Sequence, residues 1–514
     1  MRLLLTLLAC FVTQPDRDAA SDRDNDGYVA VELGGDDCDD GLSSVYPGAP
    51  ESCLDAVDSD CDGLTCPIRE ERQSTSWSSE ILYSNGALAD FDGDGTPELI
   101  LSQPEADEDR GVVFRMELPL PSDAQPEEQS TGSLRGEEAL QIWAWPLGDV
   151  DGDGDPDLMV STRWGPGTSF VLDQIEARRD GTERYSDRWL VNGSDADGSP
   201  SGSTASIYLF GQARDMGDTN GDGADEYLLA APNMDGTSDN TGVVYLMSGF
   251  PEGGQQAREQ ALQTWRGETE SAYMGGYLGL SMDLDGDGAM EALVGTPGWT
   301  GGDGESGKNQ SGALFGMSAS AANTSAATTS IYGRTANAKV SNGTAIGDIN
   351  GDGHEDLGVN VSAGNGQALI FLGPLMGTYY PEDADVRLLG DVGNEVTTDF
   401  GGDLMGRLDL NQDGLGDLLV GASTEGLGED ELPKGAGATY LYYGPLTGVQ
   451  APSHAAARWK GSVEDGNQRA DLYGDLDLDG EPDLYLLSPA DRFGNKEASG
   501  GVRIDWNMTS LEAR

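Results

Sequence analysis

Basic residues are scarce in this chain, which carries 29 Lys and Arg against 91 Asp and Glu among its 514 residues. The formal net charge is −62 at pH 7, and no run of basic residues stands out along the sequence. Nucleic-acid binding depends on neutralising phosphates with Lys and Arg, so the composition excludes nucleic acid as a partner. An acidic excess of this size also strains a compact fold by self-repulsion unless cations are bound.

Histidine is almost absent, since the chain contains His354 and His454 and no other. Neither lies near a nucleophile motif, and we find no Gly-x-Ser-x-Gly elbow, zinc signature or phosphate-binding loop. Paired carboxylates can hydrolyse glycosides, but the carboxylates that repeat in this sequence are better explained as cation ligands. We therefore predict a protein without catalysis of its own.

Long apolar runs are absent as well, because no stretch approaches the roughly 18 apolar residues of a membrane-spanning helix. The chain opens with one positive charge and a short apolar run, which is typical of an export signal. Leu7-Leu-Ala-Cys10 resembles a bacterial lipobox and predicts lipidation of Cys10. A cleaved secretory signal and a misplaced start are the alternatives. We expect residues 1–10 to be the signal and 11–20 a linker.

That N-terminus predicts an exported protein, either an outer-membrane or cell-surface lipoprotein or a secreted protein. The lipid anchor would be its only contact with a membrane.

Cysteine is confined to the start of the chain, and the four that follow Cys10 all lie within residues 21–68. This segment is too small for a hydrophobic core, and its cysteine content favours two disulfides in an exported protein. The sequence leaves three pairings open. The disulfide candidates are Cys38, Cys53, Cys61 and Cys66.

The same segment has two stretches with Asp at alternate positions, Asp22-Arg-Asp-Asn-Asp-Gly27 and Asp58-Ser-Asp-Cys-Asp-Gly63. They resemble the metal-binding motif of MopE-type bacterial surface proteins and, more loosely, thrombospondin type-3 repeats. Some MopE-type relatives are described as copper-binding, but carboxylates without His or Met suit calcium better. We expect one or two calcium ions here; an acidic disulfide-bonded spacer is the alternative. The candidate ligands are Asp22, Asp24, Asp26, Asp58, Asp60 and Asp62.

One acidic loop, Asp149-Val-Asp-Gly-Asp-Gly-Asp-Pro-Asp157, has seven copies along the rest of the chain. Every copy has Asp at positions 1 and 5, Asp or Asn at position 3, Gly at position 6 and Asp or Glu at position 9. Calcium takes about six to eight oxygens in a flexible shell, which this spacing can supply. The sixth glycine suits a sharp bend that a Cβ would obstruct. A set of solvated acidic turns that bind nothing is the alternative.

We number these loops 1 to 7 in chain order and expect about seven calcium ions in them. Asp155 and Glu481 add a carboxylate at position 7 of loops 2 and 7. The candidate ligands are Asp90, Asp92, Asp94 and Glu98; Asp149, Asp151, Asp153, Asp155 and Asp157; Asp218, Asn220, Asp222 and Glu226; Asp283, Asp285, Asp287 and Glu291; Asp348, Asn350, Asp352 and Asp356; Asp409, Asn411, Asp413 and Asp417; and Asp475, Asp477, Asp479, Glu481 and Asp483.

These loops differ from EF-hands, which need a Glu at position 12 and a helix on each side. The twelfth residue is Leu or Val in every copy. Short apolar runs such as Leu158-Met-Val follow position 9 and predict buried strands. The loops therefore belong to a β-structure.

The first Asp of the loop recurs at intervals of 59 to 69 residues, which indicates a repeat architecture. Each period also carries a small-residue turn, a glycine-led strand such as Gly242-Val-Val-Tyr, and a short strand with an aromatic residue such as Trp265. About four strands per period predict one propeller blade each. The predicted fold class is all-β, a seven-bladed β-propeller with calcium-binding loops after a small disulfide- and Asp-rich module.

The order of these pieces resembles FG-GAP repeats, the blades of the integrin α-subunit propeller. Phe210-Gly211 and Phe400-Gly401 match the FG element, and the small-residue turns match the GAP element less closely. The resemblance covers residues 77–514, after a linker at 69–76, and implies seven blades of which several hold calcium. Since propellers close by pairing chain ends, we expect the strand around Trp77 to complete the last blade.

Two tryptophans that do not recur between blades, Trp164 and Trp299, lie in loops and are candidate ligand contacts; covering a blade edge is the alternative. We predict a calcium-stabilised, surface-exposed or secreted binding or adhesion module whose partner is a protein or a glycan. A lectin-like carbohydrate binder is a second hypothesis, and a polysaccharide-degrading enzyme on the same scaffold is a third.

Overall fold

The structure is a computed structural model of the chain. It describes residues 23–24, 27–29, 31, 35, 38–39, 41–47, 61, 74–79, 84–104, 110–120, 129–136, 142–162, 168–172, 189–192, 212–235, 238–249, 260–300, 310–335, 338–362, 366–390, 399–424, 435–460, 469–480, 482–488 and 500–505. The chain forms two compact units. One comprises Met1–Arg69, Ser453–Arg458 and Arg514, and the other comprises Glu70–Pro452 and Trp459–Ala513.

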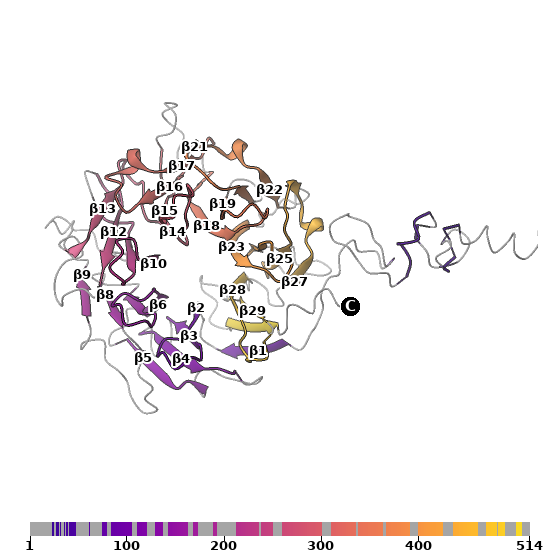
Figure 1. The fold of residues 1–514 in the computed structure, drawn as a ribbon, viewed down its shortest axis with the longest axis horizontal. Helices are drawn as coiled ribbons and strands as arrows, with labels where there is room; N and C mark the ends of the chain where they lie inside the picture. Colours follow the sequence, from indigo (N-terminus) through magenta and orange to yellow (C-terminus); the bar gives the residue numbers. More distant parts are fainter. Residues whose placement is uncertain are drawn as a thin grey trace, which may run out of the picture. The chain divides into compact units, whose positions relative to one another are not determined.

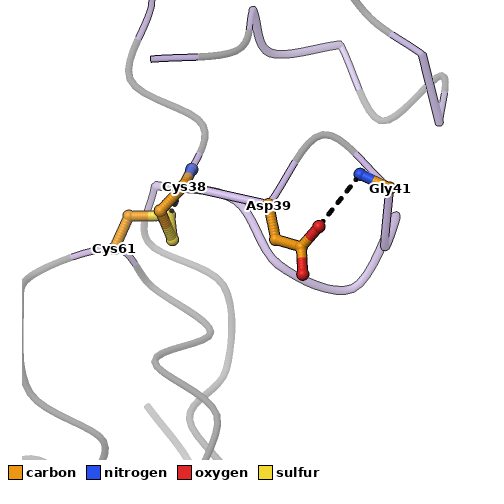
Figure 2. Close-up of a disulfide and its surroundings, with 4 residues drawn as sticks. All are labelled: Cys38, Asp39, Gly41 and Cys61. Atoms are coloured by element: carbon orange, nitrogen blue, oxygen red, sulfur yellow. Dashed lines mark hydrogen bonds between the residues drawn. A yellow bond between two sulfur atoms is a disulfide. The ribbon is translucent and has the colours of Figure 1, made fainter. Parts of the chain in front are cut away.

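The described part of the Cys- and Asp-rich segment is built from turns. Cys38 and Cys61 form a disulfide with their Cα atoms 5.6 Å apart. Figure 2 shows this bridge beside a tight turn, in which the Gly41 N–H donates to Asp39 Oδ1 over 3.2 Å. The structure thus selects one pairing from those that the sequence leaves open. Outside the described residues lie Cys53 and Cys66.

The larger unit is an all-β propeller, and its described strands form seven sheets that follow one another around a ring (Figure 1). Five sheets have four strands and two have five. In order of pairing, the four-stranded sheets are β2 (Ser84–Ala89), β3 (Glu98–Gln103), β4 (Val112–Glu117) and β5 (Gly132–Arg135); β6 (Ile142–Pro146), β7 (Leu158–Thr162), β8 (Thr168–Leu172) and β9 (Trp189–Asn192); β10 (Gln212–Gly217), β11 (Glu226–Ala231), β12 (Val243–Ser248) and β13 (Gln263–Arg266); β23 (Phe400–Leu408), β24 (Asp417–Ala422), β25 (Ala438–Tyr442) and β27 (Ala457–Lys460); and β1 (Ser74–Ser79), β30 (Gly500–Asp505), β29 (Asp483–Ser488) and β28 (Arg469–Gly474).

Each of the two five-stranded sheets includes a fifth strand that lies, in sequence, between two strands of the next sheet. They are β14 (Tyr277–Leu278), β15 (Glu291–Thr296), β16 (Ala313–Ser318), β17 (Thr329–Tyr332) and β21 (Gly377–Tyr379); and β18 (Asn342–Gly347), β19 (Asp356–Val361), β20 (Gln367–Phe371), β22 (Val386–Leu389) and β26 (Gly448–Gln450). The fifth strands β21 and β26 pair in parallel with β17 and β22, whereas the first four strands of each sheet pair antiparallel. The prediction of four strands per blade misses this fifth strand, because a three-residue strand has no readable period.

The second strand of the sheets forms the centre of the core. Strands β3, β11, β15, β19 and β24 are buried at every residue. Their apolar runs suit a strand that is covered on both faces by the neighbouring sheets. Each of these strands begins at position 9 of an acidic loop, so the loop is anchored to the most buried strand of its sheet.

The glycine that leads the third strand lets neighbouring sheets approach. Gly242 has φ +81°, a conformation that L-residues rarely adopt, and it forms a parallel bridge with Met274 of the next sheet. A Cβ at Gly242 would collide with the Met274 backbone. The aromatic residue of the outer strand has a packing role. Trp265 is fully buried, and its indole N–H donates to the Ala321 carbonyl over 2.7 Å.

The first and last strands of the larger unit pair with each other. Strand β1 runs antiparallel to β30, with Trp77 opposite Val502, and completes the sheet that contains β28 and β29. This confirms that the strand around Trp77 joins the last sheet. Among the described residues, the remaining short elements are the 3₁₀ turns η3 (Thr324–Ala326), η4 (Pro381–Asp383) and η5 (Pro452–His454), together with a few isolated turns.

Candidate metal centres

The seven acidic loops occupy one equivalent place in the seven sheets. Each loop connects the first strand of its sheet to the second, and the structure describes all of them except Glu481 in loop 7. The site is therefore a repeated one, and its geometry can be compared across seven copies.

The aspartate at position 1 organises the turn by accepting two backbone N–H groups. In loop 1, Asp90 accepts from Asp94 at 3.1 Å and from Gly95 at 2.8 Å. The same pair of bonds, from positions 5 and 6, recurs in the other six loops at 2.7–3.2 Å. These bonds close the loop around the carboxylate at position 1.

The glycine at position 6 is needed for its backbone angle, which a residue with a Cβ rarely adopts. Gly288 has φ +90°, and the other six copies have φ between +86° and +105°. No atom of a more distant residue lies within 4 Å of a Cβ built on any of these glycines, so the obstruction comes from the adjacent backbone at positive φ, as the sequence predicted. Position 4 is also left-handed in all seven loops, with Gly in five of them and Gln412 (φ +58°) and Leu478 (φ +58°) in the other two. This second constraint was not predicted from the sequence.

The acid at position 9 is buried and turned back into its own loop. All seven are at most 2% exposed. Each accepts the backbone N–H of position 2, as Glu291 does from Leu284 at 2.9 Å and Asp417 from Leu410 at 2.6 Å. Burial of a carboxylate this deep is costly unless a cation or donors offset the charge. The repeated position 9 is thus the most constrained ligand candidate of each loop.

In four loops the acidic side chains bring oxygen atoms within 4.8 Å of one another. Two like charges about 4 Å apart repel by roughly 1 kcal/mol in water and about 4 kcal/mol near a protein surface, so such groups favour a bound cation. The converging groups are Asp90, Asp92, Asp94 and Glu98 in loop 1; Asp149, Asp151 and Asp157 in loop 2; Asp283, Asp285 and Glu291 in loop 4; and Asp475, Asp477 and Asp483 in loop 7.

The other three loops, 3, 5 and 6, carry Asn at position 3 in place of Asp. Asn220 Nδ2 donates to Glu226 at 2.7 Å, and Asn350 and Asn411 donate to the aspartates at position 5 at 2.9 and 3.0 Å. In these loops an amide supplies part of the positive charge density that the acids require. The side-chain amide of asparagine can also rotate to turn its oxygen toward a cation, because the oxygen and the NH₂ group are similar in shape.

Burial raises the pKa of several acids at position 9. The pKa of Glu98 and of Glu291 rises to about 7, and that of Asp356 and of Asp417 to about 6, in each case chiefly by desolvation. The backbone N–H of position 2 opposes the shift in all four. Without a cation, these groups therefore keep their protons to a higher pH than exposed acids do.

Loop 1 differs from the others because a buried arginine reaches it. Arg115 on β4 is 2% exposed, and its Nη2 contacts Asp92 Oδ2 and lies 3.0 Å from Glu117 Oε1 and 3.5 Å from Glu98 Oε1. Asp92 and Glu98 are positions 3 and 9 of the loop. Arg115 was not among the site residues predicted from the sequence.

Several predicted ligands lie elsewhere. Asp155 faces Gly93 of loop 1, since a Cβ on that glycine would collide with its carboxylate. The carboxylate that it was expected to add to loop 2 is thus directed at a neighbouring loop. Asp24 is described but belongs to no converging group. Outside the described residues lie Glu481, Asp22, Asp26, Asp58, Asp60, Asp62, Cys10 and Trp164.

Trp299 packs in the core of the larger unit. It is 8% exposed and lies against Phe315 and Tyr332, with ring centroids 5.5 and 6.2 Å away. The burial and the ring contacts favour the alternative of a packing role for this residue, and a ligand contact at Trp299 stays a prediction.

A cavity of about 360 Å³ lies at the far end of strands β11, β15 and β19 from the acidic loops. Tyr273, Gln310 and Lys339 line it and have φ between +49° and +54°. Residues held in such strained conformations cluster at ligand sites. The cavity brings together three connections from different sheets, which no single stretch of sequence reveals. Its lining also includes Tyr277, Asn233 and Asn360.

In the part of the chain that the structure describes, no helix has the length and apolar character needed to cross a membrane.

Comparison with known proteins finds a family match, a related sequence and similar solved structures, among them the following. Residues 37–65 match the Cu-binding MopE family model, which is described as a metal-binding motif. The chain is 29% identical to mouse integrin alpha-IIb over 219 residues, which is 40% of this chain and 19% of the integrin subunit. Among solved structures, rhamnogalacturonan lyase YesW matches with a TM-score of 0.39 and 12% identity, over 85% of this chain and 76% of the lyase.

These likenesses support a metal-binding motif at the N-terminus and an integrin-like propeller after it. The chain spans about a fifth of the integrin subunit's length. The lyase likeness is too distant to carry an argument about activity.

Proposed function

We propose that the protein is a calcium-stabilised binding module, with seven propeller blades that each carry one acidic loop. The observation that carries this proposal is the convergence of carboxylate oxygens within 4.8 Å in loops whose turn is already fixed by backbone hydrogen bonds. The match to an integrin α subunit supports binding, in preference to catalysis, as the role of the propeller.

The donor set favours calcium over transition metals. Carboxylate and carbonyl oxygens suit calcium, magnesium and manganese, whereas copper and zinc favour His, Cys or Met. Calcium tolerates the irregular, flexible shell that a surface loop provides, while magnesium demands near-octahedral geometry. Residues 37–65 contain neither His nor Met, so we propose calcium for the N-terminal motif too.

The test is calcium stoichiometry on the full chain, by equilibrium dialysis, together with thermal melts in calcium, in magnesium and in chelator. We expect at least five calcium ions, weak sites of about 10⁻⁴–10⁻³ M as in extracellular modules, and a clear loss of stability in chelator. Magnesium should protect less than calcium at equal concentration. Fewer than three ions with an unmoved melt would overturn the proposed role.

A carbohydrate ligand is the second candidate, and the cavity favours it. Tyrosine faces, amides and one lysine are the groups that stack on and hydrogen-bond to sugar rings. Among the described residues that line the cavity there is no Asp or Glu, although the chain has 91 acids. The three strands that end at the cavity each begin at an acidic loop, so calcium would hold the scaffold of the ligand site.

A glycan array in calcium tests this second candidate. The variant Tyr277→Ala removes a 41% exposed ring from the cavity, and Met376→Ala removes a 67% exposed side chain elsewhere as its control. Binding that is lost in the first and kept in the second supports the carbohydrate site. Binding that survives both, or no binding to any glycan, favours a protein partner. Products from an acidic polysaccharide would instead favour the enzyme hypothesis.

We also propose export, with Cys10 as a lipid anchor. The apolar start and the Cys38–Cys61 disulfide support an oxidising destination. Labelling with a fatty acid that is lost in Cys10→Ala tests the anchor.

A further inference from the structure

In loop 1 the side chain of Arg115 supplies a positive charge next to the loop's carboxylates. The guanidinium of Arg115 contacts position 3 of loop 1 (Asp92) and lies 3.5 Å from position 9 (Glu98). Its third acidic neighbour, Glu117 at 3.0 Å, lies on the same strand. The side chain is 2% exposed, so this charge is removed from water and depends on these acids.

The strand position of Arg115 is apolar or glycine in every other sheet. Arg115 pairs with Ile100, the second residue after position 9 of loop 1. The residues that pair at the same register in the other six sheets carry no charge, so none can reach its loop as Arg115 does. They are Val171, Leu246, Gly316, Ile370, Leu441 and Ile504.

A guanidinium and a calcium ion compete for the same oxygens. Arginine stays protonated in proteins, and its planar fork binds two or more carboxylates with directed N–H groups. A calcium ion bound through Asp92 and Glu98 would sit within a few Å of that guanidinium. Two cations at that separation repel, and each would lose part of the carboxylate charge to the other.

We propose that Arg115 is the built-in cation of loop 1, so that this loop keeps its turn without calcium and is the weakest calcium site of the seven. The proposal rests on the proposed function, in which the remaining loops bind calcium. It predicts a propeller whose first loop is formed before calcium arrives.

The first test compares position 3 in two loops of the full chain. Asp285→Asn in loop 4 should bind one calcium ion fewer than the wild type and should lower the melting temperature in calcium. Asp92→Asn in loop 1 weakens an ion pair, so it should lower the melting temperature equally in calcium and in chelator. Loss of one ion in both variants would overturn this proposal alone, whereas no ion in the wild type would overturn the proposed function.

The second test removes the arginine. Arg115→Met keeps an unbranched flexible side chain and removes its charge, and Leu246→Met at the same register is the control. We expect Arg115→Met to bind one ion more than the wild type and to melt lower in chelator, with calcium restoring the difference. An unchanged ion count in a folded Arg115→Met variant would overturn the proposal. If Arg115→Met does not fold even in calcium, the comparison of Asp92→Asn with Asp285→Asn decides.

Discussion

Replacing Glu291 by Gln should change stability in opposite directions with and without calcium. Glu291 is position 9 of loop 4, is 1% exposed and accepts the Leu284 N–H at 2.9 Å. Glutamine keeps an oxygen for that hydrogen bond and the shape of the side chain, but it removes the charge. The substitution therefore separates the role of the carboxylate as a turn acceptor from its role as a metal ligand.

In chelator the buried negative charge of Glu291 destabilises the folded state. Burial, with a contribution from Asp285 and the other loop acids, raises the pKa of Glu291 from 4.5 to about 7. At about 1.4 kcal/mol per pKa unit, ionising this group in the folded state costs on the order of 3 kcal/mol above neutral pH. The weaker hydrogen bond of a neutral acceptor offsets about 1 kcal/mol of that relief. We expect Glu291→Gln to be more stable than the wild type by about 1–2 kcal/mol in chelator at pH 8.

In calcium the order should reverse. A site at 100 times its dissociation constant stabilises the fold by about 2.7 kcal/mol, and losing the position 9 ligand removes most of this. The assay is a thermal or urea melt of both proteins at pH 8, in chelator and in millimolar calcium. Glu382→Gln, at a surface ion pair with Arg334, is the control and should change little in either buffer. If Glu291→Gln is less stable than the wild type in chelator, the reasoning from the buried charge is refuted.

Three further predictions concern the acidic loops and the glycine that leads a third strand. Because the folded-state pKa of Asp356 and Asp417 lies near 6, above the unfolded value, these groups stabilise the calcium-free protein below about pH 4 and lose that contribution as pH rises through 6; melts in chelator from pH 4 to 8 should fall over this window, and melts in calcium should not. Leu478→Gly should raise stability by up to about 1 kcal/mol by relieving a left-handed residue that is 44% exposed, and a lower melting temperature would contradict this. Gly242→Ala should cost several times more than Gly288→Ala in a urea melt, because both have φ above +80° but only the first collides with a neighbouring backbone.

The position of each loop could be predicted from the sequence because it depends on local spacing. A carboxylate at position 1 and a glycine at position 6 fold onto each other within one turn, and this happens in all seven loops. The pairing of β1 with β30 was predictable for a related reason, since the aromatic strand at Trp77 repeats the pattern of Trp265 and Trp459. Periodic features of this kind need no knowledge of distant contacts.

Features that depend on register or on several connections were out of reach. Trp299 lies in a loop by sequence, but its ring fills space between Phe315 and Tyr332. The cavity is lined by turns that the chain brings together from residue 232 to residue 362. Strands β21 and β26 each leave their own sheet for the edge of the previous one. None of these arrangements follows from residue types at fixed spacing.

Arg115 shows most clearly how identical motifs can differ in function. Loop 1 has the same ligand pattern as loop 4, with Asp at positions 1, 3 and 5 and Glu at position 9. The two loops differ in the residue on the third strand that pairs with the second residue after position 9. This residue is Arg115 in one sheet and Gly316 in the other. A buried carboxylate needs a counter-charge, but the chain is free to supply a metal site, an amide or an arginine. A count of motifs therefore sets an upper limit on the number of bound ions. The residues of the neighbouring strand determine which of the loops bind one.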